Sequence, residues 1–328
     1  MNHRPMKSWI YIPVISIGLA ILFAGCATVD PHPFQQYAAA VKEAGDGLDK
    51  VLVQDIDWSR DKYIVSVLDG SVSLGHTAIL DRRGPFTVTF PETNGQTNQP
   101  TFYLLQDVRV TLLNLNEASE KYINLLAVLA GSDTVNQNKF DAMAKDTDAS
   151  LNSIIKKLDA QVPGNAIHVF SVGSAEIAGL IIENKRHDAL VKVLIESQAG
   201  IDGYSQKCLT LLRILDQSLA SDYNTKANAL EASFSRIPAE KRANDSKARA
   251  AVEQLLKLNS DYLALVHALN SAKNVYEALP QGHRELLRSV QNQPTGFDAI
   301  RNIYEEGKHL KSIYDELNKT TATSSTKG

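Results

Sequence analysis

The sequence predicts an all-α protein, folded as an elongated antiparallel bundle of long helices. Apolar residues recur at alternating spacings of three and four over long stretches, which is the period of one helix face. Glycine and proline fall mainly between those stretches, where short connections make successive helices antiparallel neighbours. One stretch departs from the pattern, and a small β-hairpin or extended loop is expected there, at about residues 84–103.

The N-terminus has the composition of a secretory signal. Basic residues precede an apolar run over residues 9–24, and the run ends in Phe23-Ala24-Gly25-Cys26. A basic start, a short apolar stretch and small residues before a cut site are the parts of such a signal. Residues 1–25 are therefore expected to be a signal peptide, with an uncleaved signal anchor as the alternative.

The ending Phe23-Ala24-Gly25-Cys26 resembles the lipobox of bacterial lipoproteins. The resemblance implies that the chain is cut before Cys26 and that Cys26 is acylated, which would tie the protein to a lipid bilayer. Ala27 follows, in place of the aspartate that tends to retain lipoproteins in the inner membrane of enteric bacteria. The resemblance therefore favours the periplasmic leaflet of the outer membrane. The helical part of the chain resembles no particular family in its motifs.

Charge and cysteine content narrow the possible partners. Removing residues 1–25 takes away two basic residues and no acid, which leaves 32 basic and 37 acidic residues. This mildly acidic balance argues against nucleic acid as a partner. The only cysteines are Cys26 and Cys208, so acylation of Cys26 leaves no intrachain disulfide. Cys208 lies on an apolar helical stripe and is expected to be a buried, unreactive thiol.

The helical domain is expected to comprise residues 34–319. It follows a lipidated tether at residues 26–33, in which two prolines oppose helix formation. Residues 34–80 have mainly helical periodicity, and breaks are expected at Gly45, Gly47 and Gly70. The hairpin prediction depends on the alternating segment 86–90, a turn at Asn94-Gly95 and a return strand at 101–103.

The remaining chain predicts helices over residues 105–129, up to about 161, 165–234, 251–279, 284–290 and beyond Pro294. Pro280 is expected to close the fourth of these, at residues 251–279, because proline opposes a helix interior. Two lobes that share the helix at 165–234 are an open possibility, and an intermolecular coiled coil is the alternative to self-packing. Residues 320–328 are expected to be a disordered polar tail. The apolar seams comprise Leu105, Val108, Leu112, Leu115, Ser119, Tyr122, Leu126, Leu129, Leu190, Leu194, Ile201, Tyr204, Cys208, Leu211, Leu215, Ala251, Leu255, Leu258, Tyr262, Leu265, Leu269, Ala272, Tyr276, Leu279, Ile303, Leu310, Ile313 and Leu317.

A search for catalytic and metal-binding motifs returns weak candidates. Glu183 and His187 lie one helical turn apart and could hold a metal, but no third ligand has matching spacing, so a solvated polar stripe is favoured. His267 is expected at the edge of the core. The acidic residues Asp55, Asp57 and Asp61 surround Trp58, which is too weak a signal for sugar chemistry. We therefore expect no enzymatic activity and no cofactor.

Residues 166–182 form an unusually apolar segment rich in small side chains. Ser171, Ala175 and Gly179 are four residues apart, a spacing that allows a close approach of another backbone. A central bundle helix is the favoured interpretation. Insertion into a membrane is the alternative, although Glu176 opposes it.

The sequence thus favours a membrane-anchored, periplasm-facing lipoprotein that acts as a non-enzymatic binding or structural module of the cell envelope, with an unidentified envelope protein as its partner. A membrane-active, pore-forming-like protein that inserts residues 166–182 is the second hypothesis. An envelope hydrolase is the third and is disfavoured, because no catalytic set can be assembled from the motifs.

Overall fold

The computed structural model describes residues 29–68, 70, 101–131, 137–161, 175–182 and 185–325. Several predicted features lie outside this part of the chain: the signal peptide, Cys26, residues 84–100 of the expected hairpin, and residues 326–328 of the tail. Residues 320–325 of the expected disordered tail instead form the end of a helix. The expected return strand at residues 101–103 is wrong, because these residues begin a helix. They continue the helical seam that follows them.

The prediction of an all-α fold is confirmed. The described residues contain seven α-helices, one short 3-10 helix and no strand. In chain order the elements are α1 (His32–Leu68), α2 (Thr101–Ala130), α3 (Gln137–Gln161), α4 (Ala175–Ile182), α5 (Arg186–Ser235), η2 (Arg242–Asn244), α6 (Ser246–Val290) and α7 (Asp298–Ser325).

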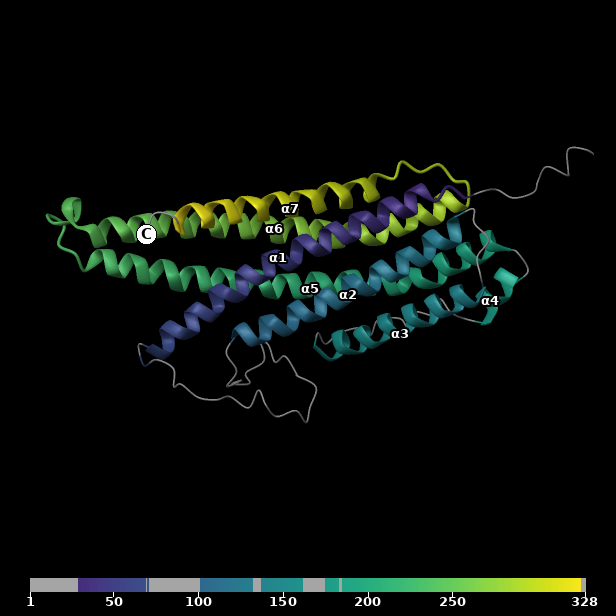
Figure 1. Cartoon of the computed structure of the whole chain (residues 1–328), viewed down its shortest axis with the longest axis horizontal. Coiled ribbons are helices and arrows are strands. Elements are labelled where there is room, and N and C mark those ends of the chain that lie inside the picture. The colour runs from purple at the N-terminus through teal and green to yellow at the C-terminus, as the bar shows by residue number, and fades with distance from the viewer. Residues whose placement is uncertain are drawn as a thin grey trace, which may run out of the picture.

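The long helices lie lengthwise against one another and give the molecule an elongated shape (Figure 1). A short connection joins α5 to α6, and the two helices run in opposite directions. Ser205 therefore contacts Tyr276, while Tyr223, further along α5, contacts Asn259, nearer the start of α6. Helix α1 packs against α2, α6 and α7, while α3 lies along α2 on the outer side (Figure 1). Side chains from α1, α2, α5, α6 and α7 meet in one continuous core.

The core includes most of the side chains that the apolar spacings predicted. The seam residues of α2, α5, α6 and α7 named above are buried, except Leu255 and Tyr262, which are partly buried. Cys208 is also fully buried, as expected, and burial raises the pKa of its thiol. Periodicity therefore located the core-facing side of α2, α5, α6 and α7.

Helix α1 begins earlier than predicted and continues to Leu68 without a break. It starts at His32, whose backbone N–H donates to the Asp30 carboxylate (2.9 Å), and Pro33 is tolerated because it lies in the first turn. The expected breaks at Gly45 and Gly47 are absent. A Cβ on Gly47 would lie 2.6 Å from Leu310 Cβ, so this glycine allows α7 to approach α1 closely.

The expectation that Pro280 ends a helix is wrong, since α6 runs through Pro280 to Val290. Proline has no N–H group, so the carbonyl oxygen of Tyr276 lacks its usual helical donor. The Ser205 hydroxyl on α5 donates to that oxygen at 2.6 Å. The neighbouring helix thus supplies the hydrogen bond that proline removes, and the separate helix expected at residues 284–290 is the last part of α6.

Two further expectations differ from the structure. The helix expected over residues 165–234 is divided, because α4 ends at Ile182 and Lys185 is not helical before α5 begins. His267 is exposed on α6 instead of lying at the edge of the core. Local periodicity does not predict the division of the helix, because it falls in a short polar stretch. It does not predict the exposure of His267 either, because this residue is next to the buried Ala268.

Replacing Gly47 by leucine should destabilise the protein by about 1–3 kcal/mol, because the added side chain would overlap Leu310 on α7. Gly179→Leu is the matched control: a Cβ on Gly179 meets no described atom within 4 Å. Both variants gain the same helix propensity, so urea unfolding followed by circular dichroism isolates the contact. Equal stability of the two variants would contradict the close approach of α1 and α7.

Candidate functional site

Only some of the predicted site residues lie within the described part of the chain. Ser171 and Glu183 lie outside the described residues, and Ala175 is the first residue of α4. His187 lies in the first turn of α5, where its Nε2 is 2.9 Å from the carbonyl oxygen of Val290 at the end of α6. Nowhere in the described ranges do three potential metal ligands of the His, Cys, Asp or Glu type come together.

Helix α4 shows how the apolar segment is placed. Ile177 and Ile181 are buried in the core, and α4 packs on α5. Gly179 has open space around it, so the close approach expected there is not made to any described atom. None of the helices in the described ranges combines the length and apolar composition needed to cross a membrane.

The most connected polar site lies inside the core, where α2, α5 and α6 meet. His283 of α6 is at its centre and is fully buried. Its Nε2 is 2.7 Å from the hydroxyl of Tyr122 on α2, and its Nδ1 is 2.8 Å from Gln198 Oε1 on α5. The Tyr122 hydroxyl also contacts the hydroxyl of Ser197. We call Tyr122, Ser197, Gln198 and His283 the histidine network.

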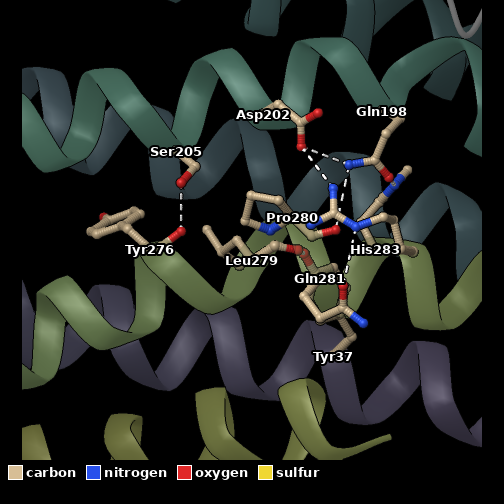
Figure 2. A network of polar contacts seen from close by, with 10 residues as sticks. Tyr37, Gln198, Asp202, Ser205, Tyr276, Leu279, Pro280, Gln281 and His283 are labelled. Atoms are coloured by element: carbon tan, nitrogen blue, oxygen red, sulfur yellow. Dashed lines mark hydrogen bonds and ion pairs between the residues drawn. The ribbon is translucent and has the colours of Figure 1, made fainter. Parts of the chain in front are cut away.

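Hydrogen bonds at the outer end of the histidine network assign its protons. Gln198 Nε2 donates to Asp202 Oδ1 (2.8 Å), which directs Gln198 Oε1 toward His283 (Figure 2). His283 then donates from Nδ1 to Gln198 Oε1, and in the neutral imidazole Nε2 accepts from the Tyr122 hydroxyl. Arg284 Nη1 lies 3.3 Å from the same Asp202 oxygen and closes the network on the surface side.

The environment of His283 keeps it neutral. Burial, and secondarily the charge of Arg284, lowers the pKa of His283 to about 3. Burial also raises the pKa of Tyr122 above its ordinary value. Serine, tyrosine and histidine side chains in contact are residue types used in catalysis. Here all three side chains are buried in the core, and their hydrogen bonds connect α2, α5 and α6.

Polar contacts around Pro280 extend this site to α1. The Tyr37 hydroxyl of α1 donates to the carbonyl oxygen of Leu279 (2.9 Å), and Gln198 Nε2 lies 3.4 Å from that of Pro280. Figure 2 shows these contacts with the Ser205–Tyr276 bond, between α5 above and α1 below. One turn of α6 is thereby held by side chains from two neighbouring helices.

A second polar layer lies further along the core, at Asn116 of α2. Asn116 Oδ1 accepts from the hydroxyls of Tyr276 (3.0 Å) and Tyr204 (3.5 Å), which belong to α6 and α5. The Asn116 side chain lies over Gly45 of α1, where a Cβ would come within 2.8 Å of Nδ2. Four helices therefore meet at this amide, which explains why glycine at position 45 does not break α1.

A third polar layer contains two buried acids. Asp55 of α1 and Asp222 of α5 are 3% and 1% exposed. Lys62 Nζ lies 2.8 Å from Asp222 Oδ1, whereas neither oxygen of Asp55 has a hydrogen-bond partner among the described residues. Asp57 and Asp61, which the sequence analysis grouped with Asp55, lie toward solvent and pair with Arg60 and Lys226. The structure thus separates Asp55 from its sequence neighbours.

A shallow groove of about 570 Å³ lies beside the acidic layer, between α1, α5 and α6. Trp58 is nearly buried at its base, and Lys226 Nζ lies 5.2 Å from the centre of the Trp58 ring. Lys257 and Asp261 form an ion pair on the α6 side (2.7 Å). The charged groups that line the groove are therefore all paired, Lys226 with Asp61 of α1 and Lys257 with Asp261.

Motif searches missed the histidine network because its members are far apart in the sequence. The available signal was polar residues at seam positions, such as Ser119 and Tyr122 among the leucines of residues 105–129. Such positions predict that a polar group is buried, and burial requires a partner. They do not identify which residue on another helix supplies it.

Comparison with known proteins adds no family to this description. No family model, curated protein or solved structure matches the chain. The candidate site is therefore interpreted from its own geometry.

Replacing Tyr122 by phenylalanine should destabilise the protein by about 1–3 kcal/mol, because it leaves the buried groups of Ser197 and His283 without a shared partner. Tyr304→Phe is the matched control, since Tyr304 is 37% exposed on α7. Thermal and urea unfolding measure both variants. A Tyr122→Phe protein as stable as the control would show that the histidine network does not hold the helices together.

Proposed function

We propose that the protein is a lipid-anchored component of the cell envelope whose helical body is a non-enzymatic binding or structural module. One observation carries the non-enzymatic part: the side chains most suited to catalysis, Ser197, Tyr122 and His283, are enclosed in the core and bonded to one another. The lipobox-like ending at Cys26 supports the anchored part. By the same resemblance, the outer membrane's periplasmic leaflet is the favoured location.

An elongated antiparallel bundle suits a bracing or binding role. Helix α5 alone has 50 residues, a length of about 75 Å at the usual rise per residue. The helices pack lengthwise around one core, so the body presents long lateral surfaces. A body of this form can reach from a membrane surface toward another envelope component. The burial of Ile177 and Ile181 favours a core role for α4 over membrane insertion.

An apolar stripe on α6 is the surface that best supports a binding role. Val252, Leu256 and Leu263 follow one face of the helix and are 44%, 64% and 57% exposed. Exposed apolar side chains that gather on one face are typical of protein interaction sites. We therefore place the contact with the unidentified envelope partner on this stripe.

Replacing Cys26 by serine should abolish acyl labelling and leave an unprocessed precursor, because the acyl chains would be carried by the Cys26 thiol and amine. Cys208→Ala is the control, since Cys208 is the other cysteine of the chain and is buried. Incorporation of labelled palmitate in the producing cells measures both. Labelling that survives Cys26→Ser would refute the lipid anchor.

The double substitution Leu256→Lys with Leu263→Lys should remove crosslinking of the protein to its envelope partner without changing the helical content. Lysine at these exposed positions opposes burial against an apolar partner surface. Val110→Lys on α2, also at an exposed position, is the control and should crosslink as the parent protein does. Crosslinking followed by mass spectrometry compares the recovered proteins. The same recovered partner in all three proteins would contradict the placement of the interface.

A further inference from the structure

The buried acids of the third layer are placed where two ionised carboxylates are not balanced. Asp222 has one cationic partner, Lys62, at 2.8 Å. Among the described residues, neither buried oxygen of Asp55 has a hydrogen-bond partner, and Asp222 Oδ2 also has none. Two negative charges in this layer thus face a single ammonium group. Burying an uncompensated charge is costly, and such a group instead binds a proton.

The charged groups on the helices around Asp55 do not supply the missing positive charge. On α5, Lys226 is paired with Asp61, and on α2, Arg109 holds Asp49 through two hydrogen bonds. Among the described residues of the other helices, three further cations are engaged with other acids. These pairs are Lys311 with Glu43, Lys257 with Asp261 and Lys273 with Asp216.

A proton on Asp55 accounts for this arrangement. A protonated carboxyl group is a hydrogen-bond donor as well as an acceptor, whereas two carboxylates can only accept. The charge of the layer then falls to zero, with Asp222 and Lys62 as its one ion pair. Burial, and secondarily the charge of Asp222, raises the pKa of Asp55 to about 8.

We propose that Asp55 and Asp222 form a proton-binding pair that joins α1 to α5 and makes the folded protein more stable toward acid. The proton is held on Asp55 and faces Asp222, and its loss leaves two carboxylates opposed across the α1–α5 contact. This property belongs to the core and does not depend on the lipid anchor or on a partner protein.

The direction of the pH effect follows from proton linkage. An ordinary aspartate in the unfolded chain loses its proton near pH 3.8, whereas folded Asp55 keeps it to about pH 8. Between these values the folded protein binds one proton more, so this group lowers the folding constant about tenfold for each unit that the pH rises. Above pH 8 both states are ionised and the contribution is constant.

His283 has the opposite effect over part of this range. Its pKa falls from 6.5 to about 3 on folding, so between those values the unfolded chain binds one proton more. The pH dependences due to Asp55 and His283 therefore cancel between about pH 3.8 and pH 6.5. The dependence due to Asp55 emerges in the folding constant between about pH 6.5 and pH 8.

The test compares the full-length protein in detergent with Asp55→Asn, which replaces the protonated carboxyl by a neutral group of the same shape. At pH 7.5 the variant should have a folding constant at least tenfold higher, and its ratio to the parent should rise about tenfold per pH unit between pH 5 and pH 8. Asp57→Asn, an exposed neighbour on α1, should leave the ratio near one. Urea unfolding at each pH gives these ratios.

A second measurement does not require a folded variant. Infrared spectra of the parent protein should show the carbonyl band of a protonated carboxylic acid at pH 7, lost as the pH passes about 8. Absence of that band, or a pH-independent ratio for Asp55→Asn, would overturn the proposal. So would stabilisation of the parent, but not of Asp55→Asn, by added Ca²⁺ or Mg²⁺, since that result would make the pair a cation site.

Discussion

The turn of α6 that contains Pro280 is the constraint on which the rest of the core depends. Proline within a helix leaves a carbonyl oxygen without its donor, and in a buried position that oxygen needs a partner from elsewhere. Ser205 of α5 supplies that partner at Tyr276, and Tyr37 of α1 donates to the adjacent carbonyl of Leu279. These contacts fix α5 and α1 against α6 at one height, which places His283, one residue beyond Gly282, opposite Tyr122 of α2.

Polar layers determine how the long helices are aligned. Apolar 3-4 seams pack almost equally well after a shift of one heptad, so they specify which faces meet better than they specify the register. The histidine network, Asn116 and the Asp55–Asp222 pair lie at three different positions along the core, and a shift would leave each without its partners. Because Cys208 is the only cysteine within the helical body, no disulfide is available there to hold the register instead.

The fold class and the buried faces were predictable because both follow from local periodicity. The errors concern residues whose conformation depends on a distant neighbour. Gly47 and Pro280 read as helix breakers in isolation, yet Leu310 and Ser205 on other helices make them compatible with continuous helices. The same reason explains why the buried acids were not predicted as a pair. In the sequence Asp55 lies close to Asp57 and Asp61, whereas in the fold its charge interacts with Asp222 of α5. No spacing pattern connects two residues that are 167 positions apart.

Helix α5 connects the two buried titratable sites of the core. It supplies Ser197 and Gln198 to His283 and, several turns later, Asp222 to Asp55. In both sites the folded state requires the neutral form, imidazole in one and carboxylic acid in the other, because the interior excludes unpaired charge. Acid acts against the first site and base against the second, and both effects bear on the same helix. The packing of α5 is therefore most favourable in the pH range between the pKa of His283 and the pKa of Asp55. In that range both side chains are neutral, as the core requires.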